Sequence, residues 1–453
     1  MTSLTARRPH LSVGGALGWF VASYGVALVG YLAVNAIAGR FLGRGLFGYF
    51  VLAMTTAAIV GQLALVGVHR SGLRDAAKLR TTDRSADDIL HLQRLVGGAH
   101  AVTWVSLPIF ALACGGVTLA LVHDRVQGLQ IGAALAIMVW LAGEQILISQ
   151  YLRGFGQVRL ASLLEGRSGG ALVAVLQAAA LFGVWRLWPG SGLVGAFGAV
   201  SAGYVVPVVI GRWALRDVFH QGRADRSLWA DLHLTVRNDW RFASNQLATY
   251  LNTTMELWVA SAILASASVS LFGAASRLAM VLMIPMTSLQ VVFAPVVARM
   301  LASGDNATLE RVLRSGTSMA TVISGLLWIP MIVIPGLILG TLFGDGFRGA
   351  STVLVLLTLG ILPSVVTGNS GTVLTMSHHE GVMATLQWAV VAIRTVGALA
   401  AGTLWGLVGL GVSSAIATAV LGVMSWWLAR SCTGIWTQAT LRPELGLLRR
   451  TRG

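Results

Sequence analysis

Residues 192–195 have the sequence GLVG, and residues 406–409 repeat these four residues at the start of a second apolar stretch. Earlier in each half, LFG at residues 46–48 is repeated at residues 271–273. The distance between copies is close to half of the 453-residue chain in both cases. Because the two pairs occur in the same order, the chain is predicted to consist of two related halves.

A third and weaker pair supports this duplication. Leu152 precedes a Gly-Phe-Gly turn, and Leu374 precedes a turn at residues 377–381 that also ends in glycine. We therefore place two domains at residues 1–225 and 226–453. In membrane proteins, internal duplication is the usual architecture of secondary transporters, whose substrate site lies where the halves face each other.

The composition is that of a membrane protein. Hydrophobic residues make up 55% of the chain, charged residues 11%, and the mean hydropathy is +0.76. Since crossing a bilayer takes roughly 20 apolar residues, the sequence predicts an all-α membrane protein with about 12 transmembrane helices in two six-helix bundles. The predicted helices are 14–38, 47–68, 95–121, 129–151, 170–188, 191–215, 241–265, 268–298, 316–343, 350–376, 382–404 and 406–429.

The basic residues predict the orientation, because Lys and Arg are retained in cytoplasmic loops. With the N-terminus inside, 25 of the 32 Lys and Arg residues fall in inner segments. We therefore expect a multi-pass protein of the cytoplasmic membrane with both termini in the cytoplasm. Six helices per half give the halves the same orientation, which is a parallel internal repeat.

The net charge of +15 does not require a nucleic-acid partner, because the arginines are dispersed over short loops that face membrane lipids. The sequence contains no phosphate-binding loop ending in Gly-Lys-Ser/Thr, no His/Cys cluster with metal spacing and no nucleophile elbow. The chain is therefore predicted not to be an enzyme, and no metal or cofactor is expected.

Polar residues within the predicted helices are the candidate site, because a charge near the bilayer centre costs about 2.5 to 3.5 kcal/mol. Asn245, Thr249, Asn252 and Glu256 recur every three or four residues, so they share one face of the helix predicted at 241–265. The simpler interpretation is that Asn and Thr hydrogen-bond to neighbouring helices. We favour it for Thr249 but not for Glu256.

Four further charged residues lie in or beside predicted helices. Arg277 follows in the next helix, and Glu256 is the nearest acidic residue in sequence that could neutralise it, as a structural ion pair or as a functional charge. Arg394 and Glu144 face either the central cleft or the interior of their own bundles, and the sequence leaves both open. Arg40 is expected at the outer mouth, where an interfacial arginine is the simpler interpretation.

Two stretches resemble a known family. RFASNQLATYLNTTMELWVASAILASASVSLFGAASRLAMVLMIPMTSLQVVFAPVVARM at residues 241–300 resembles the seventh and eighth helices of the polysaccharide (oligosaccharide-lipid) flippases in the multidrug/oligosaccharidyl-lipid/polysaccharide exporter superfamily. NAIAGRFLGRGLFGYFVLAM at residues 35–54 is similar to that family's turn between the first two helices. Glu256 stands where the family often has an acidic residue, and Arg277 and Pro295 match its basic residue and its proline. Phe272 stands where the family frequently has a tyrosine.

The resemblance implies alternating-access transfer of undecaprenyl-pyrophosphate-linked oligosaccharide to the outer leaflet during cell-surface polysaccharide biosynthesis, with glycan-assembly proteins as partners. It implies that Arg277 binds the pyrophosphate, with Arg394 and Arg40 as weaker choices, because a guanidinium matches phosphate oxygens. The residues that would meet sugar hydroxyls are Asn245, Thr249 and Asn252. Glu256 and Glu144 are the candidates for binding a coupling H⁺ or Na⁺.

Two other functions are compatible with the same sequence. One is a cation-coupled multidrug exporter of the same superfamily, although a pocket for cationic drugs should be acidic and the embedded charges here are nearly balanced. The other is a non-transporting membrane scaffold for glycan assembly, against which the polar helix face argues.

Overall fold

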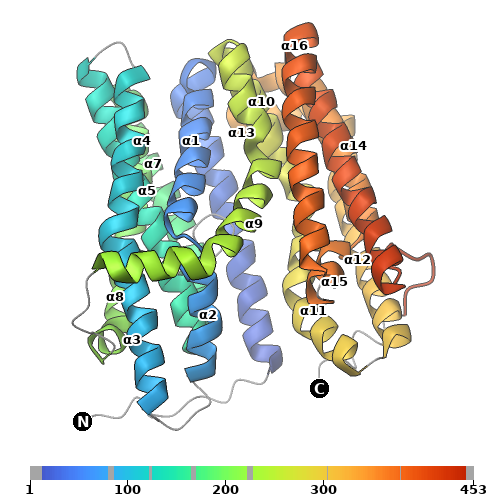
Figure 1. The fold of residues 1–453 in the computed structure, drawn as a ribbon. Helices are drawn as coiled ribbons and strands as arrows, with labels where there is room; N and C mark the ends of the chain where they lie inside the picture. The colour runs from blue at the N-terminus through green and yellow to red at the C-terminus, as the bar shows by residue number, and fades with distance from the viewer. Residues whose placement is uncertain are drawn as a thin grey trace.

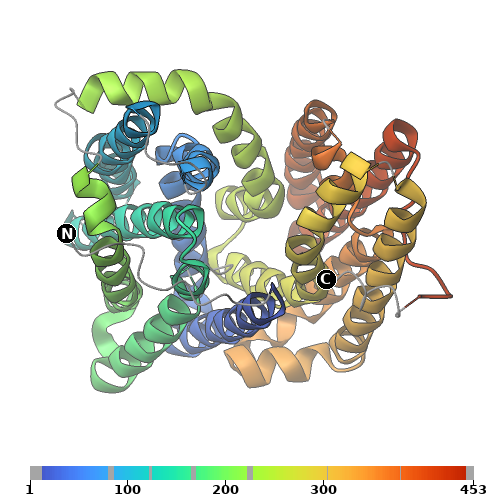
Figure 2. The same cartoon turned by 90° about the horizontal axis from the view of Figure 1, so that it is seen from below.

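The computed structural model describes residues 13–79, 86–121, 125–164, 170–221, 228–303, 305–377 and 379–444. In these residues the chain is helical and has no β-strand, and two groups of helices stand side by side (Figures 1 and 2). The predicted all-α membrane fold of two bundles is confirmed. The predicted domain boundary, between residues 225 and 226, falls outside the described residues.

The first group is built from ten elements. They are α1 (Val13–Ala64), α2 (Val68–Leu79), α3 (Ala86–Ala101), η1 (Val102–Ser106), α4 (Leu107–Leu121), α5 (Arg125–Gly154), α6 (Val158–Leu164), α7 (Ala171–Leu187), η2 (Pro189–Ser191) and α8 (Gly192–Gln221). The second group contains α9 (Leu228–Ile263), α10 (Ser266–Ala279), η3 (Met280–Met283), α11 (Ile284–Ser303), α12 (Asn306–Val333), α13 (Pro335–Phe343), η4 (Asp345–Ala350), α14 (Ser351–Thr367), α15 (Ser370–Met376) and α16 (Glu380–Thr433).

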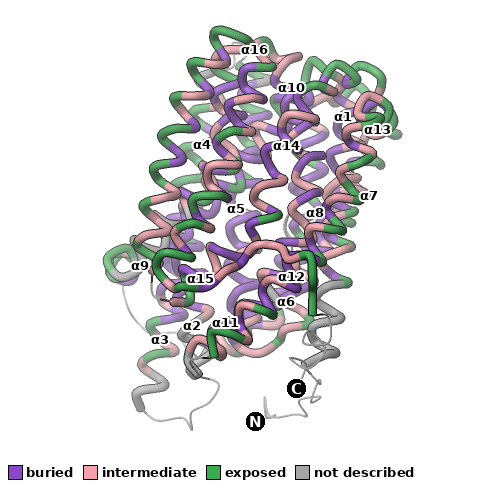
Figure 3. The backbone as a smooth tube through the Cα atoms, turned by 90° about the vertical axis from the view of Figure 1, so that its right-hand side faces the viewer, coloured by how far each residue is buried: buried purple, intermediate pink, exposed green. Residues whose placement is uncertain are grey.

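Among the described residues, eight stretches are long and apolar enough to cross a membrane. Two of them contain a break, because α1 bends back at Gly43 and α16 at Gly406, so each holds two helices. Every one of the twelve predicted ranges overlaps a helix. Exposed residues follow the outward sides of helices such as α4 and α16 (Figure 3), and many of them are large and apolar, as a lipid-facing surface requires.

Two predicted helices are interrupted. The range 316–343 is divided at Ile334, because Pro335 begins the separate helix α13 and a proline has no N–H to continue the preceding ladder. The range 350–376 is divided at Gly368, whose φ of 81° ends α14 before α15 begins. Neither break was predicted from apolar length alone.

The internal repeat is visible in the backbone. Gly192 and Gly406 open the two GLVG copies with nearly the same dihedral angles, φ 55° and ψ −137° against φ 59° and ψ −137°. The weaker pair also closes in the same way, because Gln157 N donates to Leu152 O at 2.8 Å and His379 N donates to Leu374 O at 2.9 Å. The sequence echoes therefore correspond to repeated turns.

Alanine at Gly192 or Gly406 should destabilise the protein by about 1 to 3 kcal/mol, because these dihedral angles are accessible almost only to glycine. A Cβ at either position meets no atom within 4 Å, so the loss is a backbone effect. Thermal unfolding in detergent measures it. Gly198→Ala in α8 is the matched control, since its Cβ would also meet open space and a helical glycine gains from replacement. Equal unfolding temperatures for the three variants would contradict the prediction.

The two groups meet mainly through α1 and α10. This contact lies at the end of the molecule where α1 and α16 bend back, at the top in Figure 1, which we name the distal end. Gly48 N donates to Ser270 Oγ at 2.6 Å, and Ser270 Oγ donates to Arg44 O at 2.7 Å. A Cβ at Gly273 would lie 3.5 Å from Val51 Cβ. The two LFG copies therefore pack against each other, and we name these contacts the distal contact.

Aromatic rings and one arginine extend the distal contact towards α13. The ring of Phe47 lies 5.6 Å from that of Phe343 and 5.4 Å from that of Phe347. Arg40 donates through Nε to Leu342 O at 3.2 Å and through Nη2 to Thr341 O. The cation thus satisfies carbonyls at the C-terminal end of a helix, where positive charge is favourable.

Candidate functional site

A cavity of about 310 Å³ lies in the second half. Its wall comes from α9, α10, η3, α11, α14, α15 and α16, with Thr55 of α1 as the contribution of the first half. The charged side chains on this wall are Glu256, Arg277 and Arg394. Four methionines also line it, namely Met280, Met283, Met286 and Met383. The cavity therefore combines a few charges with a flexible apolar surface.

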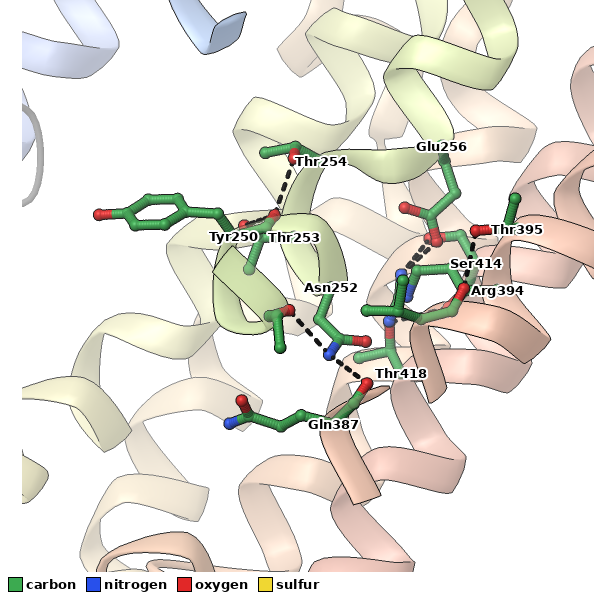
Figure 4. Close-up of polar contacts among 12 residues, drawn as sticks. Tyr250, Asn252, Thr253, Thr254, Glu256, Gln387, Arg394, Thr395, Ser414 and Thr418 are labelled. Atoms are coloured by element: carbon green, nitrogen blue, oxygen red, sulfur yellow. Dashed lines mark hydrogen bonds and ion pairs between the residues drawn. The ribbon is translucent and has the colours of Figure 1, made fainter. Parts of the chain in front are cut away.

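Glu256 and Arg394 form a buried ion pair between α9 and α16 (Figure 4). Arg394 Nη1 donates to Glu256 Oε1, and the two side chains are 3% and 4% exposed, Arg394 first. Arg394 Nη2 also donates to Thr418 Oγ1 at 3.0 Å. Glu256, the acidic residue nearest to Arg277 in sequence, pairs with Arg394 instead, because α9 packs along α16 and brings Arg394 to the carboxylate.

The polar face of α9 binds the same neighbouring helix. Asn252 Nδ2 donates to Gln387 O at 2.9 Å and to Ala248 O at 3.0 Å, and Thr249 Oγ1 donates to Gln387 Oε1 at 3.1 Å (Figure 4 shows Asn252 and Gln387). Thr249 therefore makes the interhelical hydrogen bond expected of it, and Asn252 does the same. The side chain of Asn245 lies outside the described part of α9.

Arg277 lies between the two halves. Its Nη2 donates to Thr55 Oγ1 at 2.5 Å, and its guanidinium carbon lies 5.4 Å from the ring centroid of Tyr31, both residues belonging to α1. Its Nε is buried without a hydrogen-bond partner. Since Glu256 neutralises Arg394, Arg277 is the one charged group of the cavity without an ion pair in the described part of the chain.

Glu144 lies apart from the cavity, within the first half. Its Oε1 accepts from Arg212 Nε at 2.8 Å, and its Oε2 accepts from Thr103 Oγ1 at 2.7 Å. Arg212 also stacks over the ring of Trp104 at 5.4 Å. Glu144 therefore faces the interior of its own bundle, as half of a buried ion pair, and not the central cleft. Arg212 lies in α8, within the helix predicted at 191–215, but it was not predicted as the partner of Glu144.

The structure brings five of the eight predicted residues into one cavity, namely Thr249, Asn252, Glu256, Arg277 and Arg394. Arg40 and Glu144 lie elsewhere. Three further polar residues of the cavity wall were not predicted from the sequence, namely Thr55, Gln387 and Thr418. Gln387 lies seven residues before Arg394 and so shares its helix face, a periodicity that was available in the sequence. In the described residues, no group of three or more His, Cys, Asp or Glu side chains is arranged to hold a metal ion.

No protein-family model and no curated relative matches the sequence. Solved structures do match. An inward-facing multidrug resistance MATE family transporter of the MOP superfamily has a TM-score of 0.62 at 16% identity, covering 93% of this chain and 94% of its own. An outward-facing MATE family transporter has a TM-score of 0.52 at 17% identity, covering 92% and 95%.

A third similar structure is a MOP superfamily transporter from Pyrococcus furiosus, with a TM-score of 0.53 at 15% identity and coverage of 92% and 95%. Its pocket is described as having reverse polarity, which suggests a different function for that protein. Because these identities are low, the comparisons show the fold, and that fold is the one of MATE family transporters.

Proposed function

We propose that the chain is an exporter of the multidrug/oligosaccharidyl-lipid/polysaccharide superfamily, which carries an amphipathic compound across the cytoplasmic membrane by alternating access. The observation that carries the proposal is the cavity of about 310 Å³, lined by charged, polar and methionine side chains and bordered by α1 of the other half. The fold supports it, since inward-facing and outward-facing transporters share this architecture.

The size and lining of the cavity favour a drug-sized substrate. Pockets for small molecules usually measure about 300 to 1,000 Å³ and are mostly apolar. Methionine side chains adapt to different shapes, so methionine-rich surfaces bind a range of ligands. The multidrug exporter, the alternative from the sequence, is therefore our first choice.

The charge of the cavity favours an anionic group on that substrate. The pairing of Glu256 with Arg394 leaves Arg277 as its net positive charge among the described residues. A lipid-linked oligosaccharide is the second candidate because its pyrophosphate would suit Arg277, although this cavity has room only for part of such a headgroup. The neighbour with reverse polarity supports the view that one fold serves substrates of different charge.

The conformation supports an inward-facing state. The distal contact is closed, and the similarity is greater to the inward-facing transporter, with a TM-score of 0.62, than to the outward-facing one, at 0.52. With the termini in the cytoplasm, as the arginine distribution predicts, the distal end faces outside. We therefore propose that the distal contact seals the outer side and must open to release the substrate.

Ion coupling would involve the buried acids. Glu256 is held by Arg394 and Glu144 by Arg212, so neither carboxylate is free to bind a cation. A coupling H⁺ or Na⁺ would have to displace a guanidinium. We propose that ion uptake and the opening of one of these ion pairs are the same step.

Arg277→Gln should reduce the transport of an anionic dye by about tenfold or more, because a hydrogen bond to a charged group contributes about 1.5 to 3 kcal/mol. The measurement uses reconstituted vesicles and two amphipathic dyes that differ only in headgroup charge. Arg186→Gln is the control, since this arginine lies on Phe182 and Trp185 away from the cavity. If the unchanged protein transports neither dye nor a short pyrophosphate-linked oligosaccharide, the exporter is contradicted, and equal loss in both variants would contradict the role of Arg277. Transfer of a short pyrophosphate-linked oligosaccharide, but of neither dye, would favour the second candidate.

A further inference from the structure

The beginning of α9 has a direction different from the rest of the helix. Residues 228–237, which we name the crossing segment, run across the helices of the first half, and α9 then turns to stand beside the second half (Figures 1 and 2). The crossing segment packs on α3 and η1, whereas the later part of α9 packs on α16. The crossing segment lies between the predicted helices 191–215 and 241–265 and was not itself predicted to be helical.

The contact with α3 shows at which height along the first half the crossing segment lies. The carboxylate of Asp231 is buried and lies against Gly97, where an added Cβ would be 2.5 Å from Asp231 Oδ2. Along α3, His91 and Arg94 are exposed before Gly97. After Gly97, Trp104 is exposed in η1, which continues α3. The crossing segment therefore lies where an exposed surface changes from charged to aromatic.

The same change occurs along α8, where exposed Val205 and Val209 are followed by exposed Trp213 and Arg216. In a membrane protein, a boundary between exposed apolar residues and charged residues with tryptophan marks the edge of the hydrocarbon region. The crossing segment is thus level with the headgroup region on the side of the membrane opposite the distal end.

The outward face of the crossing segment has the composition of an interfacial helix. Trp229 is 65% exposed, and Leu234 and Val236 are also exposed apolar side chains. Arg237 is exposed on the same segment. Apolar and aromatic side chains next to a basic residue are typical of a helix that lies in the plane of the membrane and prefers anionic lipid.

We propose that the crossing segment is a membrane anchor that lies in the headgroup region and recruits anionic phospholipid through Arg237. Large apolar side chains are also exposed on α4 and α8 of the same half, so the bilayer is the occupant that the surroundings specify. Anchoring would hold one end of α9 while the other end carries Thr249, Asn252 and Glu256 along the cavity wall. The anchor does not depend on the proposed export activity.

Depth measurements on reconstituted full-length protein test this anchor. Trp229→Cys is labelled with an environment-sensitive fluorophore after Cys114→Ser and Cys432→Ser remove the native thiols of the described chain. The label should be quenched most by lipids that carry a nitroxide at the headgroup. Leu112→Cys, at a position 71% exposed on α4, should be quenched most by a mid-chain nitroxide. Leu441→Cys, fully exposed after α16, should be quenched by aqueous iodide.

The result that overturns the anchor is a label at residue 229 that responds to iodide as residue 441 does. Shielding from all three quenchers would also overturn it, because a second protein copy would then cover this face. Neither readout measures transport, so failure of the anchor and failure of the exporter are distinguishable.

The lipid preference is tested with headgroup nitroxides on phosphatidylglycerol and phosphatidylcholine at equal content. One arginine near an anionic surface contributes about 1 kcal/mol, so phosphatidylglycerol should be enriched about fivefold at the labelled crossing segment. Arg237→Gln should remove this enrichment, and Arg348→Gln, an exposed arginine in η4 at the distal end, should preserve it. Equal quenching by the two lipids in the unchanged protein would contradict the anionic preference.

Discussion

A disulfide across the distal contact should abolish transport, and a reductant should restore it. The double variant Val51→Cys/Gly273→Cys places one thiol in α1 and one in α10, and a Cβ at Gly273 would lie 3.5 Å from Val51 Cβ. Disulfides join Cβ atoms about 3.5 to 4.5 Å apart, so the bond can form without displacing the helices. If release requires this contact to open, the oxidised protein is held in the inward-facing state.

The matched control joins two helices of one half. A Cβ at Gly411 in α16 would lie 3.7 Å from Leu356 Cβ in α14, so Leu356→Cys/Gly411→Cys should also form a disulfide. This bond spans no moving contact and should leave transport intact. Both double variants are measured with Cys114 and Cys432 replaced by serine. Full cross-linking between residues 51 and 273 with unchanged transport would contradict the opening of the distal contact.

Arg394→Leu should destabilise the protein by about 3 to 5 kcal/mol, because it leaves the Glu256 carboxylate buried without its counter-ion. The side chain of Glu256 is 4% exposed, so water cannot replace the guanidinium without rearrangement. The double variant Glu256→Met/Arg394→Met should recover most of the lost stability, since buried ion pairs can be replaced by apolar side chains of similar volume at little cost. Thermal unfolding in detergent compares the three proteins.

The other buried carboxylate provides the control. Arg212, the partner of Glu144, has a side chain that is 38% exposed, so solvent or headgroups can reach the site when the guanidinium is removed. Arg212→Leu should therefore destabilise the protein less than Arg394→Leu. If the double methionine variant is as unstable as Arg394→Leu alone, the loss does not come from an unpaired Glu256.

Local patterns in the sequence predicted most of the fold. Apolar length located the helices, because a membrane span must satisfy its own backbone hydrogen bonds. The GLVG copies located repeated turns because the left-handed conformations of Gly192 and Gly406 require glycine. The three-to-four residue spacing along α9 gathered Thr249, Asn252 and Glu256 on one cavity wall.

Pairing between distant residues was not predictable from these patterns. Glu256 and Arg394 are 138 residues apart, and they meet because α9 packs on α16. Arg277 is much closer to Glu256 in sequence but does not pair with it. Glu144 and Arg212 are 68 residues apart, and nothing in the local sequence links one to the other. The methionines of the cavity carried no signal, since methionine in a membrane helix is ordinary apolar packing.

The change in direction along α9 could not be predicted from local sequence patterns either. Its first turns contain charged residues and lie outside the predicted helices, although Trp229, Leu234 and Val236 lie among them. Their exposure depends on how the segment packs on α3 and η1, which places Asp231 inward and the apolar side chains outward. The membrane anchor therefore became visible only with the tertiary structure.

Double electron–electron resonance between the distal ends of the two halves tests alternating access most directly. Spin labels at Leu187 in α7 and Leu404 in α16 stand next to Gly192 and Gly406, at positions 70% and 72% exposed. In reconstituted vesicles we expect one distance for the state with a closed distal contact and a longer one whose population grows when substrate and an ion gradient are supplied. A single unchanged distance under all of these conditions would contradict the account.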